Sequence, residues 1–283
     1  MIPYLTAEQI VALLPPAAAV AAVEDALRAG LDPSAGAARS AVPLRHGSLL
    51  LMPAESEAHA GVKIVTVAPG NAALGLPRIN ALYAVFDAVT LQPAALLDGT
   101  ALTTLRTPAV SFAAVRRLLP PNPHVVVFGA GPQGRGHVDT LNDLVTPASV
   151  TVVTRTSNAG VDRSLRGADL VVCATTAREP LFDSALLGDH AIVVAVGSHE
   201  PDAREVDSAF CARATVIVED RATALREAGD VVRAVADGVL DPDRLATIGD
   251  EVDPAGPVLF KGTGMAWQDL VVAEAVLAAA PAT

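Results

Sequence analysis

The chain has 283 residues, which is enough for two domains that each bury a hydrophobic core. Hydrophobic residues make up 51% and charged residues 18% of the sequence, a balance typical of a globular protein, which excludes a disordered chain. The formal net charge of −11 opposes the phosphates of nucleic acid, and no apolar run approaches the ~18 residues of a membrane span, so neither is expected as a partner.

Lysines and cysteines are both rare in this sequence. Eighteen of the 20 cationic residues are arginines, and the two lysines are Lys63 and Lys261. Because the protein is acidic overall, an anionic ligand would need a local cluster of such cations. Cys173 and Cys211 are too few for a disulfide framework and lie in apolar segments, which indicates buried thiols in a reducing compartment. The N-terminal segment lacks the basic region of a secretory signal, so we expect a cytoplasmic protein.

The first part of the chain predicts helices and then a sheet. Thr6 and Gln9 have the spacing of a capping box that begins a short helix ending near Leu14, and residues 17–29 predict a second helix. Four strands are predicted at residues 48–52, 61–67, 79–87 and 94–97, followed by a helix over residues 100–119. Since the connections between these strands are too short for crossover helices, the sheet should be largely antiparallel or mixed.

The pattern changes after Pro121. Five short runs rich in Val and Ile follow, separated by segments with room for helices: HVVVF, SVTVV, ADLVVCA, AIVVAV and ATVIV. Continuous apolar strands of this kind predict a parallel sheet that is covered on both faces. The parallel pattern ends near Asp253, so the run PVLF and a helix over residues 264–280 are expected to pack on the first domain.

A glycine-rich turn, GAGPQG, directly follows the strand HVVVF and precedes a predicted helix. Its members are Gly129, Ala130, Gly131, Pro132, Gln133 and Gly134. The first glycine permits a tight turn, the second lets the backbone approach a pyrophosphate, and the third allows close packing of helix and strand. The pyrophosphate would bind at the N-terminus of the helix. In this context the turn predicts a dinucleotide site, the alternative being a turn with a structural role alone.

The end of the second parallel strand predicts which nucleotide binds. A protein that binds NAD usually has an acidic residue about 20 positions beyond the glycines, but no acidic residue occurs between residues 144 and 161. The segment there contains Thr154, Arg155 and Thr156, and an arginine flanked by hydroxyls suits a 2′-phosphate. We therefore expect NADP(H), with a solvated arginine at a strand end as the alternative.

The connection after Arg155 is short. Only residues 156–167 separate it from the next predicted strand, which suffices for one brief crossover. This half of the fold is expected to be abbreviated.

Five segments carry a resemblance to a known family. They are GVKIVTVAPGNAALGLP, LLDGTALTTLRTPAVS, VVFGAGPQG, AVGSHEPDAREVD and LFKGTGMAWQD. In this order they resemble the blocks of the ornithine cyclodeaminase/mu-crystallin family, over nearly the whole chain. The resemblance implies an α/β protein in which a Rossmann-type NADP-binding domain (residues 119–256) is inserted into an α+β substrate-binding and dimerisation domain (residues 1–118, completed by 257–283). It also implies a homodimer that pairs through the second of these domains.

The resemblance assigns roles to particular residues. The cations that bind the substrate carboxylate in the family fall on Arg39, Lys63 and Arg106. Arg106 can fork onto a carboxylate, while Lys63 can act as a point charge or a proton donor; an ordinary salt bridge is the alternative for each. Thr107 resembles a threonine near the cofactor phosphates. Further cofactor contacts are implied on the nicotinamide side, at Thr175, Val196, Gly197 and Lys261.

Two departures from the family pattern bear on the activity. Ornithine cyclodeaminases have an aspartate where this chain has His199 and a glutamate where it has Leu50. Because those acids handle the amino groups of ornithine, loss of ammonia from ornithine is disfavoured. The resemblance then implies an NADPH-dependent reductase of a small cyclic or linear 2-imino acid. The alternatives are a lyase like ornithine cyclodeaminase that uses NAD(P) catalytically, and an NADPH-binding protein of low activity.

His199 is a candidate proton donor for such a reduction. A protonated imine accepts hydride more readily, and the usual pKa of histidine suits that step. The alternative is a histidine in a solvent-exposed loop without a catalytic role. We expect no metal, because a site built from Glu55, Glu57 and His59 is better explained as a solvated turn.

Overall fold

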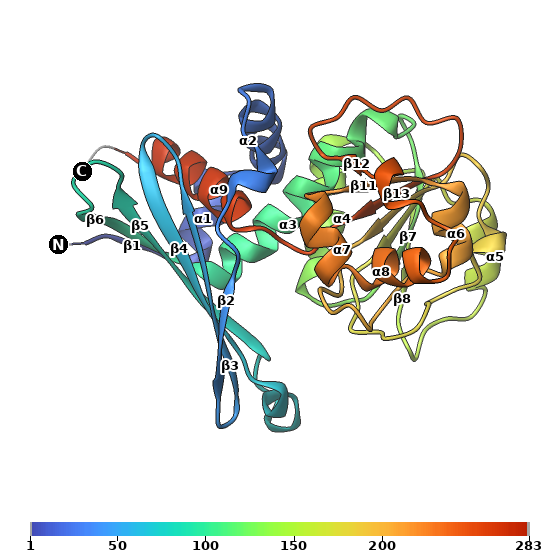
Figure 1. The fold of residues 1–283 in the computed structure, drawn as a ribbon, viewed down its shortest axis with the longest axis horizontal. Helices are drawn as coiled ribbons and strands as arrows, with labels where there is room; N and C mark the ends of the chain where they lie inside the picture. The colour runs from blue at the N-terminus through green and yellow to red at the C-terminus, as the bar shows by residue number, and fades with distance from the viewer. Residues whose placement is uncertain (1, 282–283) are drawn as a thin grey trace. The chain divides into compact units, whose positions relative to one another are not determined.

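The computed structural model describes residues 2–281 of the chain. It divides into two compact units, Met1–Ala109 with Met265–Thr283, and Val110–Gly264, each with its own sheet (Figure 1). No single helix among the described residues is long and apolar enough to cross a membrane. The helices Ala7–Leu13 and Pro16–Arg28 pass that test only as a pair, and they are bent by 71°.

The predicted capping box is confirmed at the start of α1 (Ala7–Leu13). The Thr6 hydroxyl accepts a hydrogen bond from the Gln9 amide, and the Gln9 side chain accepts one from the Thr6 amide. This satisfies two of the amide groups that every helix start leaves without partners. The following helix, α2 (Pro16–Arg28), begins with a proline in its first turn and buries one face in the core.

The sheet of the first unit has six strands. They are β1 (Tyr4–Leu5), β2 (Ser40–Leu44), β3 (Gly47–Glu55), β4 (His59–Val67), β5 (Ile79–Asp87) and β6 (Pro93–Asp98), in the order β1-β6-β5-β4-β3-β2. All neighbours are antiparallel except β1 and β6, so the expected mixed sheet is confirmed. The bounds of β5 match the predicted ones. β1 and β2 were not predicted, because one has two residues and the other is exposed throughout.

Two long helices accompany the first sheet. α3 (Gly99–Val115) directly follows β6, and α9 (Ala266–Ala279) packs on β3, β4 and α2. Short 3-10 turns occur at Pro33–Ala35, Pro69–Leu74 and Arg116–Leu118. Met52, Lys63, Tyr83 and Leu97 lie directly opposite one another across four strands, and all four are buried. Since side chains alternate along a strand, this row marks the covered face of the sheet.

The second unit has a seven-stranded parallel sheet. Its strands are β7 (His124–Phe128), β8 (Ser149–Val153), β9 (Leu170–Cys173), β10 (Ile192–Ala195), β11 (Thr215–Val218), β12 (Ala246–Thr247) and β13 (Val258–Lys261), in the order β12-β11-β13-β10-β9-β7-β8. The connecting helices are α4 (Pro132–Leu144), α5 (Val161–Arg166), α6 (Ser208–Arg213), α7 (Arg221–Glu227) and α8 (Gly229–Ala236), with 3-10 turns at Ser184–Leu186 and Pro242–Arg244. The five predicted apolar strands and their parallel pairing are confirmed.

The chain reverses direction across this sheet after β8, which is an edge strand. From β8 it returns through the short α5 to β9, on the other side of β7. The expected abbreviation of this half is thereby confirmed, because one brief helix is the whole crossover. Ligands of such sheets bind outside the carboxyl ends of the strands where the order reverses, which here lies between β7 and β9.

One expectation about the run PVLF is wrong. It was expected to pack with the first domain, but β13 lies between β10 and β11 in the parallel sheet. Its four residues are all buried, as in a strand covered on both faces, and its backbone pairs with a strand at each edge. A run of four apolar residues carries no periodicity that assigns it to one sheet rather than the other.

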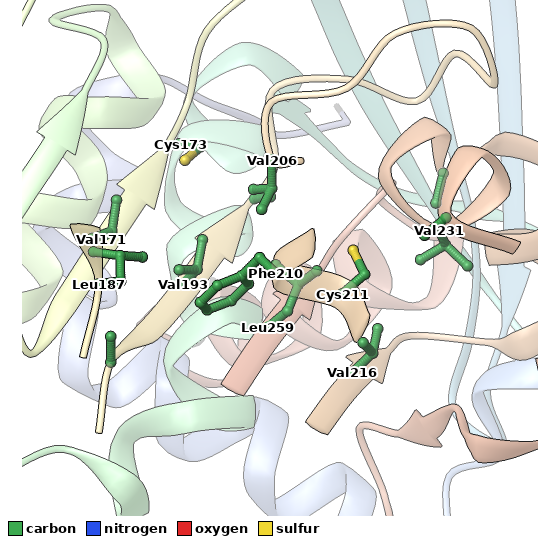
Figure 2. Close-up of a cluster of buried hydrophobic side chains, with 14 of the residues drawn as sticks. Val171, Cys173, Leu187, Val193, Val206, Phe210, Cys211, Val216, Val231 and Leu259 are labelled. Atoms are coloured by element: carbon green, nitrogen blue, oxygen red, sulfur yellow. The ribbon is translucent and has the colours of Figure 1, made fainter. Parts of the chain in front are cut away.

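The core of the second unit fills the space between strands and helices. Figure 2 shows Phe210 of α6 beside Val193 of β10 and Leu259 of β13, all nearly fully buried. Cys173 and Cys211 belong to the same cluster and are free thiols. The strands therefore pack tightly against the helices, and this packing fixes the positions of their carboxyl ends.

Candidate functional site

The three glycines between β7 and α4 have three different surroundings. Gly129 has φ +109°, a conformation that other residues rarely adopt, and a Cβ there would lie 2.5 Å from the Ala174 carbonyl oxygen. A Cβ at Gly134 would lie 1.9 Å from the Gly129 carbonyl oxygen, so only glycine lets the helix pack this closely on the turn. A Cβ at Gly131 would meet nothing within 4 Å. The backbone there faces open space beside the first amides of α4, which suits a pyrophosphate.

A buried histidine connects this helix start to α3. His137 Nδ1 lies 2.8 Å from the Gln133 carbonyl oxygen, and Nε2 lies 2.9 Å from Ser111 Oγ. Burial lowers the pKa of His137 to about 4, so its imidazole is neutral at physiological pH. The ring packs at 6.0 Å from that of Phe112. Sequence reasoning did not identify this residue.

The segment after β8 forms a tight turn that presents Arg155. Thr154 and Ser157 close the turn through a backbone bridge, and the Ser157 amide also donates to Thr154 Oγ1 at 3.1 Å. The hydroxyls of Thr154 and Thr156 lie 3.3 Å apart. Arg155 is exposed and forms no ion pair with any residue that the structure describes. Its guanidinium is therefore available to bind an anionic group.

A single buried carboxylate joins the ends of β9 and β10. Glu205 accepts hydrogen bonds from the Thr175 amide (2.8 Å), the Thr175 hydroxyl (2.7 Å) and the Gly197 amide (2.7 Å). Burial raises the pKa of Glu205, against the opposing effect of Lys261. A Cβ at Gly197 would lie 2.1 Å from the Thr175 carbonyl oxygen, so the two strand ends touch.

Lys261, the last residue of β13, interacts electrostatically with this carboxylate. Its Nζ pairs with Asp230 Oδ2 at 2.8 Å and donates to the Ser198 carbonyl oxygen at 2.8 Å. Asp230 Oδ1 accepts from the amides of Glu205 and Val206. Burial opposes the charge on Lys261, but Asp230 and Glu205 outweigh it and raise the pKa of the lysine above its usual value. These contacts of Lys261 are internal to the second unit, and its expected contact with the cofactor stays a prediction.

His199 lies in the loop after β10 and is exposed. The loop is fastened next to it, because Arg178 donates to Glu200 at 2.6 Å and also pairs with Asp202. Val196, which precedes Gly197, is partly buried. The structure therefore holds the loop of His199 beside the Thr175 segment, and the role of the histidine stays a prediction.

The first unit contains a buried cluster of opposite charges. Lys63 of β4 pairs with Asp269 of α9 at 2.8 Å, between Nζ and Oδ2. Arg106 of α3 lies with Nε 3.5 Å from Oδ1 of the same carboxylate, an ion pair without a hydrogen bond, and its Nη1 donates to Gln268 Oε1 at 2.8 Å. Lys63 is 3% exposed, Arg106 7%, and Asp269 and Gln268 are fully buried.

This environment changes the basicity of Lys63. Burial lowers its pKa most, Asp269 raises it, and Arg106 and Arg39 lower it again, which together bring the pKa of Lys63 to about 8. Arg39 thus acts electrostatically on Lys63, so the structure brings the three predicted carboxylate-binding cations into one electrostatic neighbourhood. Thr107 follows Arg106 on α3 and donates to the Thr103 carbonyl oxygen at 2.9 Å.

Four residues of these clusters were not singled out from the sequence. Asp269, Gln268 and Glu205 lie inside the family-like segments LFKGTGMAWQD and AVGSHEPDAREVD, and Asp230 lies outside them. A polar residue among apolar ones near a helix start was the available signal for Gln268 and Asp269. The structure also pairs His59 with Glu274 at 2.9 Å, and no group of three or more His, Cys, Asp or Glu among residues 2–281 could hold a metal ion.

Comparison with known proteins identifies the relatives of this chain. The family model described as "Ornithine cyclodeaminase/mu-crystallin family" matches residues 4–163 and 150–282. The chain belongs to this family. It is 32% identical to the Delta(1)-pyrroline-2-carboxylate reductase 2 of Burkholderia ambifaria over 82% of this chain and 81% of that protein. It is 31% identical to the mouse ketimine reductase mu-crystallin over 84% and 83%.

A solved relative has the same fold. An archaeal alanine dehydrogenase dimer with bound NAD is 26% identical, with a TM-score of 0.86 over 98% of this chain and 95% of that chain. The Rossmann-type parallel sheet predicted from the sequence is therefore confirmed for this member of the ornithine cyclodeaminase/mu-crystallin family.

Proposed function

We propose that this protein is an NADPH-dependent reductase that converts a small cyclic or linear 2-imino acid to the amino acid. The observation that carries the proposal is the charge of the buried cluster in the first unit. Lys63 and Arg106 contribute two positive charges and Asp269 one negative charge, so this trio has an uncompensated positive charge. An uncompensated buried charge is unfavourable, and a substrate carboxylate would neutralise it.

The relatives support the same class of reaction. Two of them are named as reductases of Δ1-pyrroline-2-carboxylate and of ketimines. A nicotinamide nucleotide, when bound, supplies the hydride for such a reduction. In the second unit the turn Gly129 to Gly134 would hold its pyrophosphate, and Thr175 and Gly197 would line the nicotinamide side.

The protein's own residues would orient the substrate and supply a proton. Arg106, Lys63 and Arg39 would hold the carboxylate, which fixes the C=N carbon for hydride addition. The imine nitrogen must gain one proton for each hydride that the carbon gains. Lys63, with a pKa of about 8, is a candidate donor near neutral pH, and His199 is the second.

The test of the activity uses purified protein and two substrates. With Δ1-pyrroline-2-carboxylate and NADPH, we expect stoichiometric loss of absorbance from the reduced nucleotide. Replacement of Lys63 by Met should abolish that loss. Ornithine with oxidised nucleotide should release no ammonia. Ammonia without net change in the cofactor would instead indicate a lyase, and nucleotide binding with neither reaction would indicate a binding protein.

The preference for NADPH rests on Arg155 and its hydroxyl neighbours. Because Arg155 is exposed and has no ionic partner among the described residues, its charge is available to a 2′-phosphate. Arg155→Ala should weaken NADPH binding about tenfold, the effect of one exposed charge-assisted hydrogen bond, and leave NADH binding unchanged. Arg244→Ala, at another exposed arginine of the same unit, is the control. Tighter binding of NADH than NADPH by the unaltered protein would contradict the assignment.

The proton donor can be assigned from the pH dependence of turnover. If His199 donates the proton, His199→Gln should lower kcat and change the pH dependence of kcat, at an unchanged KM. An unchanged profile would leave Lys63 as the donor.

We also infer a homodimer that pairs through the first unit. Along β4 and β5 the side chains alternate, and the face opposite the covered one exposes the neighbouring residues Ile64 (38%) and Leu82 (45%). The edge strand β2 adds Val42 (46%) and Leu44 (51%). Apolar exposure on an unprotected sheet favours association. A monomer in sedimentation equilibrium would refute this inference, and Ile64→Glu should weaken the dimer.

The cytoplasmic location is part of the proposal. Cys173 and Cys211 are both buried and free, and burial raises the pKa of Cys211 to about 12, which keeps it a thiol. Such residues suit a reducing compartment. Cell fractionation would test the location directly.

A further inference from the structure

One carboxylate in the first unit contacts two cations that come from different elements. Asp269 lies in the first turn of α9 and is fully buried. Its Oδ2 accepts from Lys63 on β4, and its Oδ1 faces Arg106 on α3. We propose that Asp269 is a positioning residue for the reduction, which holds Lys63 and Arg106 in place for the substrate carboxylate and keeps Lys63 protonated. The inference rests on the proposed function.

The geometry gives Asp269 this role because the two cations would otherwise repel each other. Like charges in a partly desolvated site cost free energy, and a shared carboxylate between them offsets that repulsion. The adjacent Gln268 accepts from Arg106 Nη1, so two consecutive residues of α9 fix two nitrogens of the guanidinium. The remaining nitrogen, Nη2, donates to no residue that the structure describes, which leaves it for a substrate.

The other titratable groups around Lys63 cannot replace Asp269. Arg106 and Arg39 act against its charge. Tyr83 lies on β5 directly opposite Lys63 and is fully buried. Burial, together with Asp269 and Glu274, raises the pKa of this phenol, so the phenol stays neutral. Glu274, further along α9, pairs with His59. Among the described residues, Asp269 is therefore the carboxylate that pairs with Lys63.

This pairing has a consequence for the proton. Near neutral pH the Lys63 ammonium can give one proton to the imine nitrogen, which becomes N–H as the carbon receives the hydride. The lysine is left as a neutral amine, and solvent restores its proton. Without the Asp269 charge the amine would already be neutral at lower pH, and the donor would be lost.

The lysine content makes a direct test possible. With two lysines in the chain, protein labelled with [15N]lysine gives two side-chain Nζ signals, and Lys63→Met assigns them. Asp269→Asn, which keeps the shape and removes the charge, should move the titration midpoint of Lys63 down by about 1 unit or more. Glu274→Gln, on the same helix, should leave it in place. An unchanged midpoint in Asp269→Asn would overturn the inference.

A kinetic measurement tests the same residue in the reaction. In Asp269→Asn the alkaline fall in kcat should begin at lower pH and KM for the imino acid should rise, while the affinity for NADPH, which reports on folding, stays unchanged. Asp269→Glu should restore part of the pH profile. A uniform fall in kcat at every pH would mean a structural role alone and would overturn the inference. Should Asp269→Asn fail to fold, Asp269→Ser removes the same charge and leaves room for water.

The failure of this inference can be distinguished from failure of the proposed function. If the unaltered protein reduces no imino acid, the proposed function is wrong, and the lysine titration still decides whether Asp269 controls Lys63. If the reduction occurs and the titration does not respond to Asp269→Asn, only the positioning role is wrong.

Discussion

The depressed pKa of Lys63 should make the stability of the protein depend on pH in a specific direction. A lysine usually titrates near 10.5, and in the folded protein the pKa of Lys63 is about 8. Between these two values the unfolded chain binds a proton that the folded protein does not, so the free energy of unfolding rises with pH. Below pH 8 Lys63 is charged in both states, and the free-energy cost of burying that charge lowers the stability in full. Toward pH 10.5 the folded protein holds a neutral amine, so this cost disappears.

The magnitude follows from the same two values. Their difference is about 2.5 units, which corresponds to about 3 kcal/mol in all at 1.36 kcal/mol per unit. Between pH 7 and pH 9.5, the part that is gained above pH 8 is about 2 kcal/mol. Lys63→Met lacks the titrating group, so its stability should be flatter over this interval by about that amount.

Denaturation by guanidinium chloride at a fixed protein concentration measures the effect. The quantity compared is the change in unfolding free energy from pH 7 to pH 9.5, for the unaltered protein minus Lys63→Met. Arg78→Met, at an exposed cation of the β4–β5 connection, should behave like the unaltered protein. If the unfolding free energy depends on pH equally in the unaltered protein and in Lys63→Met, the pKa of Lys63 is not lowered in the folded protein.

Three further substitutions test the packing on which the two sites depend. Gly134→Ala should weaken NADPH binding at least about tenfold in a fluorescence titration, because its methyl group would lie 1.9 Å from the Gly129 carbonyl oxygen. Lys261→Met should lower the unfolding free energy by about 3–5 kcal/mol in urea, since it leaves Asp230 buried without its cation. Gly61→Ala should lower it by about 1–3 kcal/mol, because its methyl group would lie 2.2 Å from the Tyr83 hydroxyl.

Matched controls exist for these changes. Gly70→Ala and Gly167→Ala each add a methyl group where nothing lies within 4 Å, and both should be near neutral for stability. If Gly61→Ala is as harmless as Gly70→Ala, the Tyr83 side chain has room to move away from the added methyl group. Normal NADPH affinity in Gly134→Ala would remove the turn from the nucleotide site. Lys261→Met with full stability would mean that the ion pair with Asp230 does not stabilise the fold.

Periodicity and local motifs predicted most elements but not their long-range partners. A strand-like run between two segments rich in turn residues indicated the bounds of β5, and the Thr6 capping box placed the start of α1 correctly. The strand β13 was misassigned because four apolar residues look alike in either sheet. The parallel order of the other strands followed from their continuous apolar character.

The charged clusters depend on distances that a single sequence does not contain. Lys63 and Asp269 are 206 positions apart, and Arg106 and Gln268 are 162 apart. The cations were predicted through the family resemblance, whereas the carboxylate that joins them comes from α9, which meets β4 only through tertiary packing. The same holds for Glu205, whose partners are the backbone amides of two other strand ends.

The contacts of Glu205 bear on how much order a nucleotide must impose when it binds. One side chain ties the peptide after β9 to the peptide after β10, and Asp230 fixes the backbone of Glu205 itself. These hydrogen bonds join groups of the protein itself. The segments after β9 and β10 therefore lose little conformational freedom when a nucleotide binds. More of the binding free energy is then available to orient the nicotinamide ring. Calorimetry should accordingly find a small entropic penalty for the unaltered protein and a larger one for Glu205→Ala.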